Sequence, residues 1–455
     1  MTTNGWKAGV ARADITPDLG LAMDGYLGRG PATGIGAPLT ATALALSAGR
    51  EVGAEPQARS ESSATVIVCC DLLCLSSTTL ERVRESLRAQ PDLEVDLLLS
   101  CSHTHTGPVT EGHDLLGVAR DARSADYLDV LVGALADLVV AAVDALEPAT
   151  VSYARAEAAI GVNRRRRDAY GTVHMEPNPD GDYDPRVDVL RVDRCHPVAP
   201  LAVVMNAACH AVSLGDLWRQ WHPDFPGVAR DLVEAETGAV ALFVQGAAGD
   251  VNSLLFGHDA ANPEILGTRL GEAVVDAWRG ASALQPMAPV NHALSRSVVL
   301  PRLRPATVEE ADARVMALER ELALIEADAP DDPKYLRWAQ VRLQNARAGR
   351  DGARGGASES FVEELTAVAL DRDTAIVTAP GEVFTALAVR IRARSPFVNL
   401  FYAGYTNGSV YYVPTREAYA EGGYEIESAC FVAPEAGESL VEATVELLEQ
   451  LHRSL

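Results

Sequence analysis

The sequence predicts an α/β fold with layered mixed sheets and one helical insertion. Between residues 64 and 145, apolar runs of strand length alternate with segments of helical periodicity. Later apolar runs each end at a polar, Gly-rich or His-bearing segment. A Glu/Arg/Ala-rich stretch inside the chain supplies the insertion, at residues 305–350. Because there is no internal repeat and no long low-complexity linker, we expect a single domain over residues 1–455.

The first 45 or so residues are rich in Gly and Pro, which predicts loops with short strands. Two strand–helix pairs follow in the first half of the chain. "ATVIVCCDLLCLS" (64–76) is a buried strand ending in Asp71, and "STTLERVRESLRAQ" has the pattern of a capped helix. "VDLLLSCSHTHTGP" predicts a second buried strand that leads into two histidines. Residues 125–145 then form a long helix of apolar periodicity.

Further strand candidates follow, namely "ATVSYARAEAAIGVNR", "RVDVLRVD", "LAVVMNAACHAVSLG" and "AVALFVQGAAGDVNS". In α/β sheets, sites usually lie beyond the carboxyl ends of such strands, so we expect the polar segments after them to meet. Residues 307–349 predict two helices broken at "DAPDDP", and 349–360 predict a flexible loop. The chain then returns to strands.

Composition excludes several classes of protein. The formal net charge of −24 argues against a nucleic-acid partner, and the basic run "NRRRR" (163–167) is too short to change that. No apolar stretch approaches the ~18 residues of a spanning helix, so we expect no stable membrane association. The seven cysteines form no C-x-x-C pair and the N-terminus lacks a signal-peptide pattern, so we expect reduced thiols and a cytoplasmic location.

Two histidines one residue apart, His103 and His105 in "CSHTHTGP", are the first candidate for a metal site. On an extended backbone their rings would share one face of a strand. His210, Glu382 and Tyr412 each follow an apolar strand and could complete a zinc site with a vacant position for water. The alternatives stay open: His210 as a satisfied structural histidine, Glu382 as a helix cap and Tyr412 as a core aromatic.

Other polar residues allow two interpretations. Asp71 and Asp250 end apolar strands, so they are either turn caps or hydrogen-bond partners for histidine N–H groups. "HPDFPG" (222–227) suits either a pocket or a structural turn. Three further histidines stand in polar, loop-like contexts and are expected to be exposed: His113, His174 and His258.

Several motifs, in order over about residues 8–430, resemble the neutral/alkaline (non-lysosomal) ceramidase family. They are "ITPDLGLAMDGY", "SHTHTGP", "VNRRRRDAY", "DPRVDVLRVD", "QGAAGDVN", "APGEVFTAL" and "YVPTREAYAEGGYE". The resemblance implies that fold, restricted to the catalytic domain, and we expect no C-terminal immunoglobulin-like domain.

The resemblance also implies the roles of the site residues. It assigns a zinc ion to His103, His210, Glu382 and Tyr412. His105 matches a catalytic histidine near the metal-bound water, and Arg164 and Tyr424 match positions that line the substrate amide. The chain has "GDVNS" where the family has Gly-Asp-Val-Ser-Pro-Asn, so Asn252 takes the place of the serine and Ser253 follows it. Asn252 could hydrogen-bond an oxyanion there.

These features predict a zinc-dependent hydrolase that uses activated water to cleave the C–N amide bond of a small N-acyl compound. The missing serine and the missing extra domain disfavour a sphingolipid substrate at a membrane surface. Two alternatives remain: a zinc-dependent esterase or acyltransferase on a small acylated metabolite, and a non-catalytic metal- or ligand-binding protein. The acyl chain, the amine, the oligomeric state and the choice between Asn252 and Ser253 are left open by the sequence.

Overall fold

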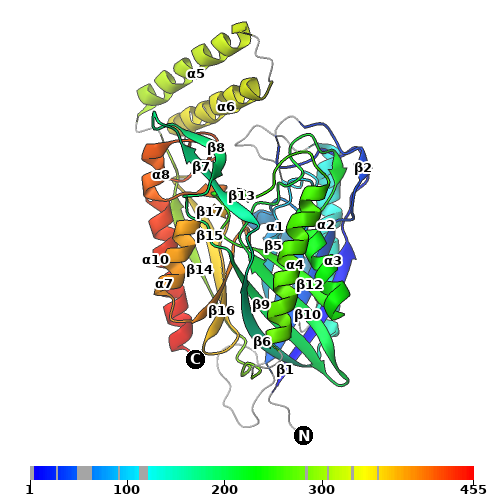
Figure 1. Cartoon of the computed structure of the whole chain (residues 1–455). Helices are drawn as coiled ribbons and strands as arrows, with labels where there is room; N and C mark the ends of the chain where they lie inside the picture. Colours follow the sequence, from blue (N-terminus) through cyan, green and yellow to red (C-terminus); the bar gives the residue numbers. More distant parts are fainter. Residues whose placement is uncertain are drawn as a thin grey trace.

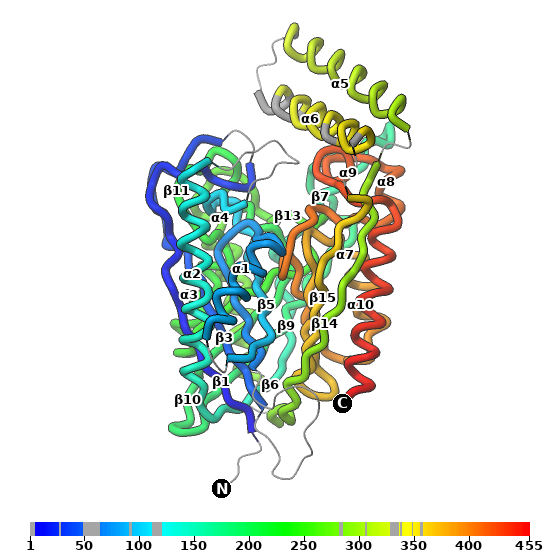
Figure 2. Tube along the Cα trace, turned by 180° about the vertical axis from the view of Figure 1, so that it is seen from behind, coloured from blue at the N-terminus to red at the C-terminus, as the bar shows by residue number. Residues whose placement is uncertain are grey.

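Two sheets stacked face to face form the centre of the molecule, and helices cover the outer face of each (Figures 1 and 2). The computed structural model describes residues 5–26, 29–48, 64–90, 93–111, 121–281, 285–304, 307–328, 333–355 and 358–455. The predicted α/β class with mixed sheets is confirmed. His113 lies outside the described residues.

The larger sheet mixes parallel and antiparallel pairs. Within the described residues its order is β12 (Val240–Gln245), β10 (Val198–Ala207), β9 (Arg186–Cys195), β6 (Glu147–Glu157), β1 (Trp6–Asp14), β3 (Thr40–Ala48), β4 (Ala64–Cys70) and β5 (Val95–Cys101). The two outermost pairs, β12–β10 and β4–β5, are parallel, and the pairs between them are antiparallel.

The smaller sheet has the order β14 (His292–Pro301), β15 (Ser360–Ala369), β16 (Thr374–Thr378) and β18 (Asn399–Ala403), and its last pair is parallel. Short sheets lie at the end where the parallel strands finish. They are β13 (Val251–Ser253) with β7 (Gly161–Arg167) and β8 (Val173–Asn178), β17 (Glu382–Val383) with β19 (Tyr412–Val413), and β2 (Gly34–Ile35) with β11 (Gln220–Trp221).

Helices α1 (Ser77–Arg88), α2 (Ala122–Asp144), α3 (Asp224–Thr237) and α4 (Ala261–Ala281) cover the larger sheet (Figures 1 and 2). Helices α7 (Thr385–Arg394) and α10 (Ala436–Arg453) cover the smaller one. The predicted insertion is confirmed as the hairpin α5 (Val308–Asp328) and α6 (Pro333–Gly355), which projects beyond the sheets near α8 (Arg416–Glu421) and α9 (Tyr424–Glu427).

Strand β4 explains why the central strands are apolar throughout. Its residues Val66 and Val68 pack under α1 and α2, while Ile67 and Cys69 point to the smaller sheet and meet Phe401 and its neighbours. Both faces of the strand are therefore buried, which is what an unbroken apolar run indicates. The core between the sheets draws on strands from both of them.

Several predicted elements are confirmed and two expectations are wrong. The capped helix begins after Ser76, whose side chain accepts a hydrogen bond from the Thr79 N–H. The N-terminal region contains two nine-residue strands, β1 and β3, paired along their whole length, where only short strands were expected. Residues 349–355 belong to α6 and are no loop, because helix-forming residues separate their glycines and Arg354 pairs with Asp312 of α5.

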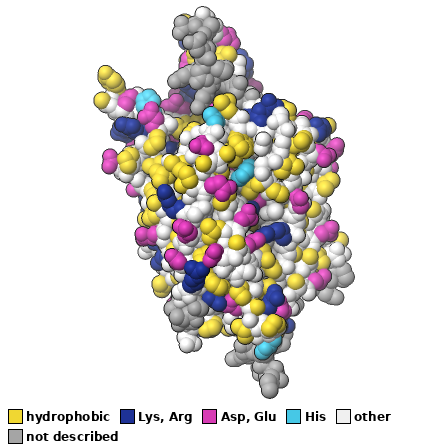
Figure 3. Space-filling model, turned by 45° about the vertical axis from the view of Figure 1, so that its right-hand side comes forward, with side chains coloured by type: hydrophobic (Ala, Val, Ile, Leu, Met, Phe, Trp, Pro, Cys, Tyr) yellow, Lys and Arg dark blue, Asp and Glu magenta, His cyan; other side chains and the backbone are white. Residues whose placement is uncertain are grey.

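Other findings bear on the class of protein. No helix among the described residues has both the length and the apolar character that crossing a bilayer requires. All seven cysteines are free, and all but Cys195 are buried. On the face drawn in Figure 3, basic side chains are scattered among acidic ones, with no basic patch of the kind that nucleic acid binds.

Glu363 on β15 generates a prediction about pH. Burial raises the pKa of this carboxyl to about 7, although a hydrogen bond with Ser77 opposes the rise. The pKa of Glu363 is higher in the folded state than in the unfolded chain, so the protonated carboxyl favours the folded state. Its contribution to the free energy of unfolding is complete below about pH 4 and is lost as the pH rises through 7. We predict that Glu363→Gln flattens the fall in unfolding free energy between pH 5 and pH 8, measured by urea denaturation. An unchanged slope would contradict the assignment.

Candidate metal centre

His103 and His105 follow β5 but do not extend it as a strand. His103 adopts a left-handed backbone conformation with φ 61°, so the expected extended arrangement is wrong. The two rings still converge, because the turn brings their Nε2 atoms to 3.3 Å with the ring planes 83° apart. The Cβ of any residue other than glycine at position 25 would lie 2.5 Å from the His105 ring, so Gly25 permits this placement.

His210 and Glu382 reach the same point from the ends of other strands. His210 follows β10, and its Nε2 lies 3.0 Å from Glu382 Oε2. Glu382 begins β17, just after β16, and the same oxygen lies 3.4 Å from His103 Nε2. A Cβ at Gly249 would fall 2.4 Å from the Glu382 carbonyl oxygen, so glycine is required for this close approach.

Backbone carbonyls fix the orientation of two of the rings. The Nδ1 atom of His103 lies 2.8 Å from the Leu73 carbonyl oxygen. That of His210 lies 2.6 Å from the Ala248 oxygen and 3.0 Å from the Val251 oxygen. A carbonyl can only accept, so Nδ1–H donates in both rings, and each Nε2 faces Glu382 Oε2.

Asp71 and Asp250 do not serve as histidine partners. Asp71 pairs with Arg230 of α3 at 2.7 Å and also accepts from the Thr40 backbone. Asp250 accepts from the backbone and hydroxyl of Thr385. Asp71 therefore links β4 to α3 and β3, and Asp250 binds the start of α7. Carbonyl oxygens take the place of these carboxylates as partners of the histidine rings.

The donor set fits a divalent cation. Burial opposes ionisation of Glu382, but His103 and His210 hold its pKa well below the usual range. Burial lowers the pKa of His210 to about 4, so its ring is neutral. One Glu382 oxygen lies 3.0 Å from His210 Nε2 and 3.4 Å from His103 Nε2. Imidazole nitrogens and a carboxylate oxygen that converge in this way are a donor set that suits a divalent cation.

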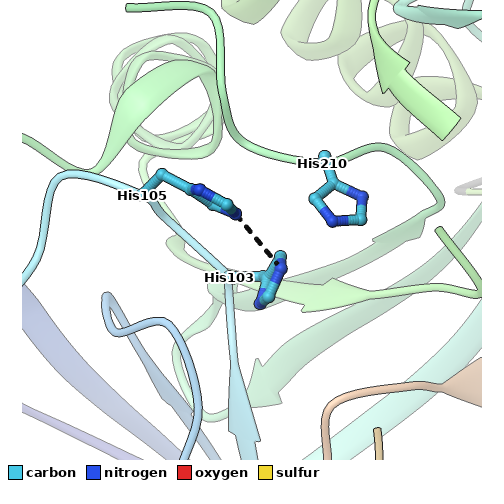
Figure 4. Close-up of side chains that lie close together, drawn as sticks. All are labelled: His103, His105 and His210. Carbon is cyan, nitrogen blue, oxygen red and sulfur yellow. Dashed lines mark hydrogen bonds between the residues drawn. The ribbon is translucent and has the colours of Figure 1, made fainter. Parts of the chain in front are cut away.

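His105 is the third histidine of the cluster (Figure 4). One ring nitrogen from each of His103, His105 and His210 lies within 4.8 Å of the others. Burial, together with the neighbouring His103 and His210, lowers the pKa of His105 well below its usual range. Its Nδ1 atom is buried and has no hydrogen-bond partner among the described residues. The ring is therefore a neutral base beside the other two.

Arg164 organises the second half of the site. Its side chain donates to Tyr412 Oη and to the Gly249 carbonyl, each at 2.9 Å. It also donates to Asn252 Oδ1 at 2.9 Å and to Glu425 Oε1 at 2.7 Å. Because arginine only donates, the Asn252 oxygen must face it, which leaves the amide N–H groups to point elsewhere.

A pocket of about 220 Å³ brings the predicted residues together. Seven of the eight line it, and His210 lies behind them against His103 and Glu382. Most of its remaining wall is apolar, from Met23, Leu73, Val109, Met175, Val212 and Phe256. Tyr424 lies with its ring centroid 5.8 Å from that of Tyr412. Ser253, in contrast, points away and donates to the His210 carbonyl at 2.7 Å.

Residues of the "HPDFPG" motif are structural. The ring of His222 accepts a hydrogen bond from the Asp224 N–H at 2.9 Å. Asp224 opens α3 and accepts from Ser213 and Phe225. His174 and His258 are exposed, as expected, and each lies beside an aspartate.

Sequence reasoning missed two tyrosines that line this pocket, Tyr26 and Tyr405. Tyr405 packs its ring against His103 with the centroids 4.2 Å apart, and Tyr26 lies 5.0 Å from the ring of His105. "MDGY" was visible as part of a motif, so Tyr26 could have been considered. Nothing in the local sequence "AGYTNGS" distinguishes Tyr405 from a core aromatic.

Comparison with solved structures gives the architecture a name. Neutral ceramidase from Pseudomonas aeruginosa superposes with a TM-score of 0.73 at 20% identity, covering 100% of this chain and 75% of that one. The chain has the neutral ceramidase fold. A second structure, of a ceramidase complexed with C2, gives a TM-score of 0.73 at 18% identity and covers 100% of this chain and 76% of that one. No protein-family model and no curated protein sequence matches the chain.

Substitution of the clustered residues tests directly whether they bind a metal. We predict that His103→Ala and Glu382→Ala each abolish stoichiometric metal binding, because each removes a donor atom from the centre. Elemental analysis of the purified variants measures this. The control is His222→Ala, which removes a half-buried histidine outside the pocket and should keep its metal. Retention of one metal per chain in either of the first two variants would remove that residue from the centre.

Proposed function

We propose that the protein is a metal-dependent hydrolase that cleaves the C–N amide bond of an N-acyl compound, with zinc as its metal. One observation carries the proposal: the Nε2 atoms of two carbonyl-anchored histidines and a buried carboxylate oxygen meet beside an apolar pocket. The ligand set suits zinc, because imidazole and carboxylate are both common zinc ligands. A solved structure with this fold is a neutral ceramidase from Pseudomonas aeruginosa, which supports the proposal.

Each residue of the pocket has a proposed task. His103, His210, Glu382 and Tyr412 would hold zinc, which when bound supplies a Lewis acid for polarising the carbonyl and activating water. His105 would accept the proton of the attacking water and pass it to the leaving nitrogen. Water oxygen adds to the carbonyl carbon, the C–N bond breaks, and the products are a carboxylic acid and an amine.

The other residues would hold the substrate or position those that do. Four N–H donors of Arg164 are committed to the protein, so we assign it the positioning of Tyr412 and Asn252 rather than a major contact with substrate. Asn252 would donate its free N–H to the developing oxyanion. Tyr424 would line the pocket on the side of the amide that Asn252 contacts. The apolar wall suits the acyl chain.

A chelator tests the dependence on metal. We predict that removing the metal abolishes hydrolysis of N-acyl amines and lowers the melting temperature, and that zinc restores both. Magnesium should restore neither, because a site built on imidazole nitrogens disfavours that hard cation. Turnover that survives complete removal of metal would contradict the proposal. Binding of zinc without turnover of any acyl compound would favour a non-catalytic protein.

The bond that is cleaved needs its own comparison. Purified protein would be given an amide and the ester of the same acyl chain and a matched leaving group. The proposal expects turnover of the amide, with the ester cleaved as well because it is intrinsically more reactive. Cleavage of the ester alone would favour an esterase or acyltransferase.

Asn252 distinguishes water from serine as the nucleophile. We predict that Asn252→Ala lowers kcat by about 100-fold and keeps the metal, because an oxyanion donor is lost. Ser253→Ala should retain turnover to within several-fold, because this hydroxyl faces the His210 carbonyl and lies outside the pocket lining. Kinetics with a chromogenic N-acyl amide measure both. Full activity of Asn252→Ala, or loss of activity only in Ser253→Ala, would contradict the assignment.

The site of action in the cell is also part of the proposal. Seven free cysteines, six of them buried, suit a reducing compartment. We therefore propose a cytoplasmic enzyme acting on a small N-acyl metabolite. Thiol titration of the native and unfolded protein, after purification without reductant, checks that the seven cysteines are free thiols.

A further inference from the structure

Tyr405 occupies a strained and tightly held position at the edge of the centre. It follows β18 with φ 52°, in the left-handed region, where a residue other than glycine costs about 1–2 kcal/mol. Its carbonyl accepts from the Cys101 N–H at 3.2 Å, and its own N–H donates to Gly381 at 3.3 Å. The backbone is thus fixed to the strand ends that deliver His103 and Glu382.

The side chain lies in the pocket against the candidate ligands. Its ring centroid is 4.2 Å from that of His103 and 6.2 Å from that of His210. Tyr405 is only 3% exposed, yet it belongs to the lining of the pocket. The phenol is therefore enclosed between the candidate ligands and the pocket.

The hydroxyl of Tyr405 is buried and has no hydrogen-bond partner among the described residues. Buried hydroxyls are normally satisfied, and leaving one unsatisfied costs roughly 1–3 kcal/mol. Tyr412, in the same pocket, is satisfied by Arg164. Tyr26 is also unsatisfied, but Leu27 and Gly28 beside it lie outside the described residues. Tyr405 is therefore the clearer case of a donor kept for an acceptor that the described residues do not supply.

We propose that Tyr405 donates its hydroxyl hydrogen to the carbonyl oxygen of the bound acyl group and keeps that bond as the oxygen gains negative charge. The inference rests on the proposed amide hydrolysis. The O–H bond is not broken, so no proton leaves the phenol. An amide nitrogen is no acceptor, because its lone pair is delocalised, and the carbonyl oxygen is thus the group of the scissile amide that can satisfy the hydroxyl.

The chain offers a matched control in Tyr402. This residue is fully buried in the core beneath α7 and α10, and its hydroxyl is likewise without a partner among the described residues. Tyr402 is absent from the lining of the pocket. Removing either hydroxyl should leave the melting temperature unchanged or raise it, because no hydrogen bond is lost.

The kinetic test compares Tyr405→Phe with Tyr402→Phe on a chromogenic N-acyl amide. We expect Tyr405→Phe to lower kcat by about 100-fold with a small change in KM, and to keep full metal content. Tyr402→Phe should match the unmodified protein. Unchanged kcat in Tyr405→Phe would overturn the inference. Loss of metal would make Tyr405 a ligand, and a lowered melting temperature would give its hydroxyl a structural role; either result also overturns it.

A binding measurement separates this inference from the proposed activity. Hexanohydroxamic acid presents a carbonyl oxygen beside the metal without needing turnover. By calorimetry on the zinc-loaded protein, we expect Tyr405→Phe to bind it about tenfold more weakly, which corresponds to one hydrogen bond, and Tyr402→Phe to bind it normally. Equal binding by both variants, or no binding by the unmodified protein, would contradict the inference. If no amide is hydrolysed while this difference holds, the proposed function fails and the donor role of Tyr405 stands.

Discussion

Hydrogen bonds from two imidazole Nδ1–H groups to backbone carbonyls are the constraint on which the site depends. They fix His103 against Leu73, and His210 against Ala248 and Val251. With both Nδ1 atoms held in this way, both Nε2 atoms face Glu382. Rotating the His103 ring would take from the Leu73 carbonyl its ring N–H donor, and rotating either ring would turn Nε2 away from Glu382. The geometry for metal binding is thus a consequence of backbone hydrogen bonding.

The fold delivers these groups because its parallel strand pairs end together. Strands β5, β10, β16 and β18 each lead into a short irregular segment at one end of the two sheets. Cross-links tie these segments to each other: Gln245 donates to the Ser102 and Cys209 carbonyls, and Asn407 bonds Leu99 and Leu97 of β5. Left-handed residues such as His103 and Tyr405 can exist there because so many bonds hold the backbone.

Much of the architecture was predictable, because apolar runs and helix caps are local signals. Strand β4 and the helix after Ser76 are examples. The eight predicted site residues do gather around one pocket, a convergence that the sequence supported through motifs rather than spacing. The expected strand geometry at His103 failed because a left-handed turn leaves no mark in residue type. The carbonyl partners of the histidines were invisible for a similar reason, since every residue carries a carbonyl and only the fold selects one.

Long-range pairing limited prediction in other places. Asp71 accepts a hydrogen bond from Arg230, which lies 159 positions further along the chain. The sequence around either residue does not indicate that the two are partners. Tyr405 could not be predicted for a related reason, because its informative feature is a hydroxyl without a partner among the described residues. A missing interaction is defined only once all neighbours are placed. A buried polar group without a partner lowers the stability of the folded state, and a role in function is one explanation for keeping such a residue.

X-ray absorption at the zinc K-edge of the purified protein tests the central claim most directly. The account predicts one zinc per chain with nitrogen and oxygen neighbours at about 2.0–2.2 Å, and the outer-shell scattering of imidazole rings. A sulfur shell near 2.3 Å, or a protein with no stoichiometric metal after loading, would contradict it.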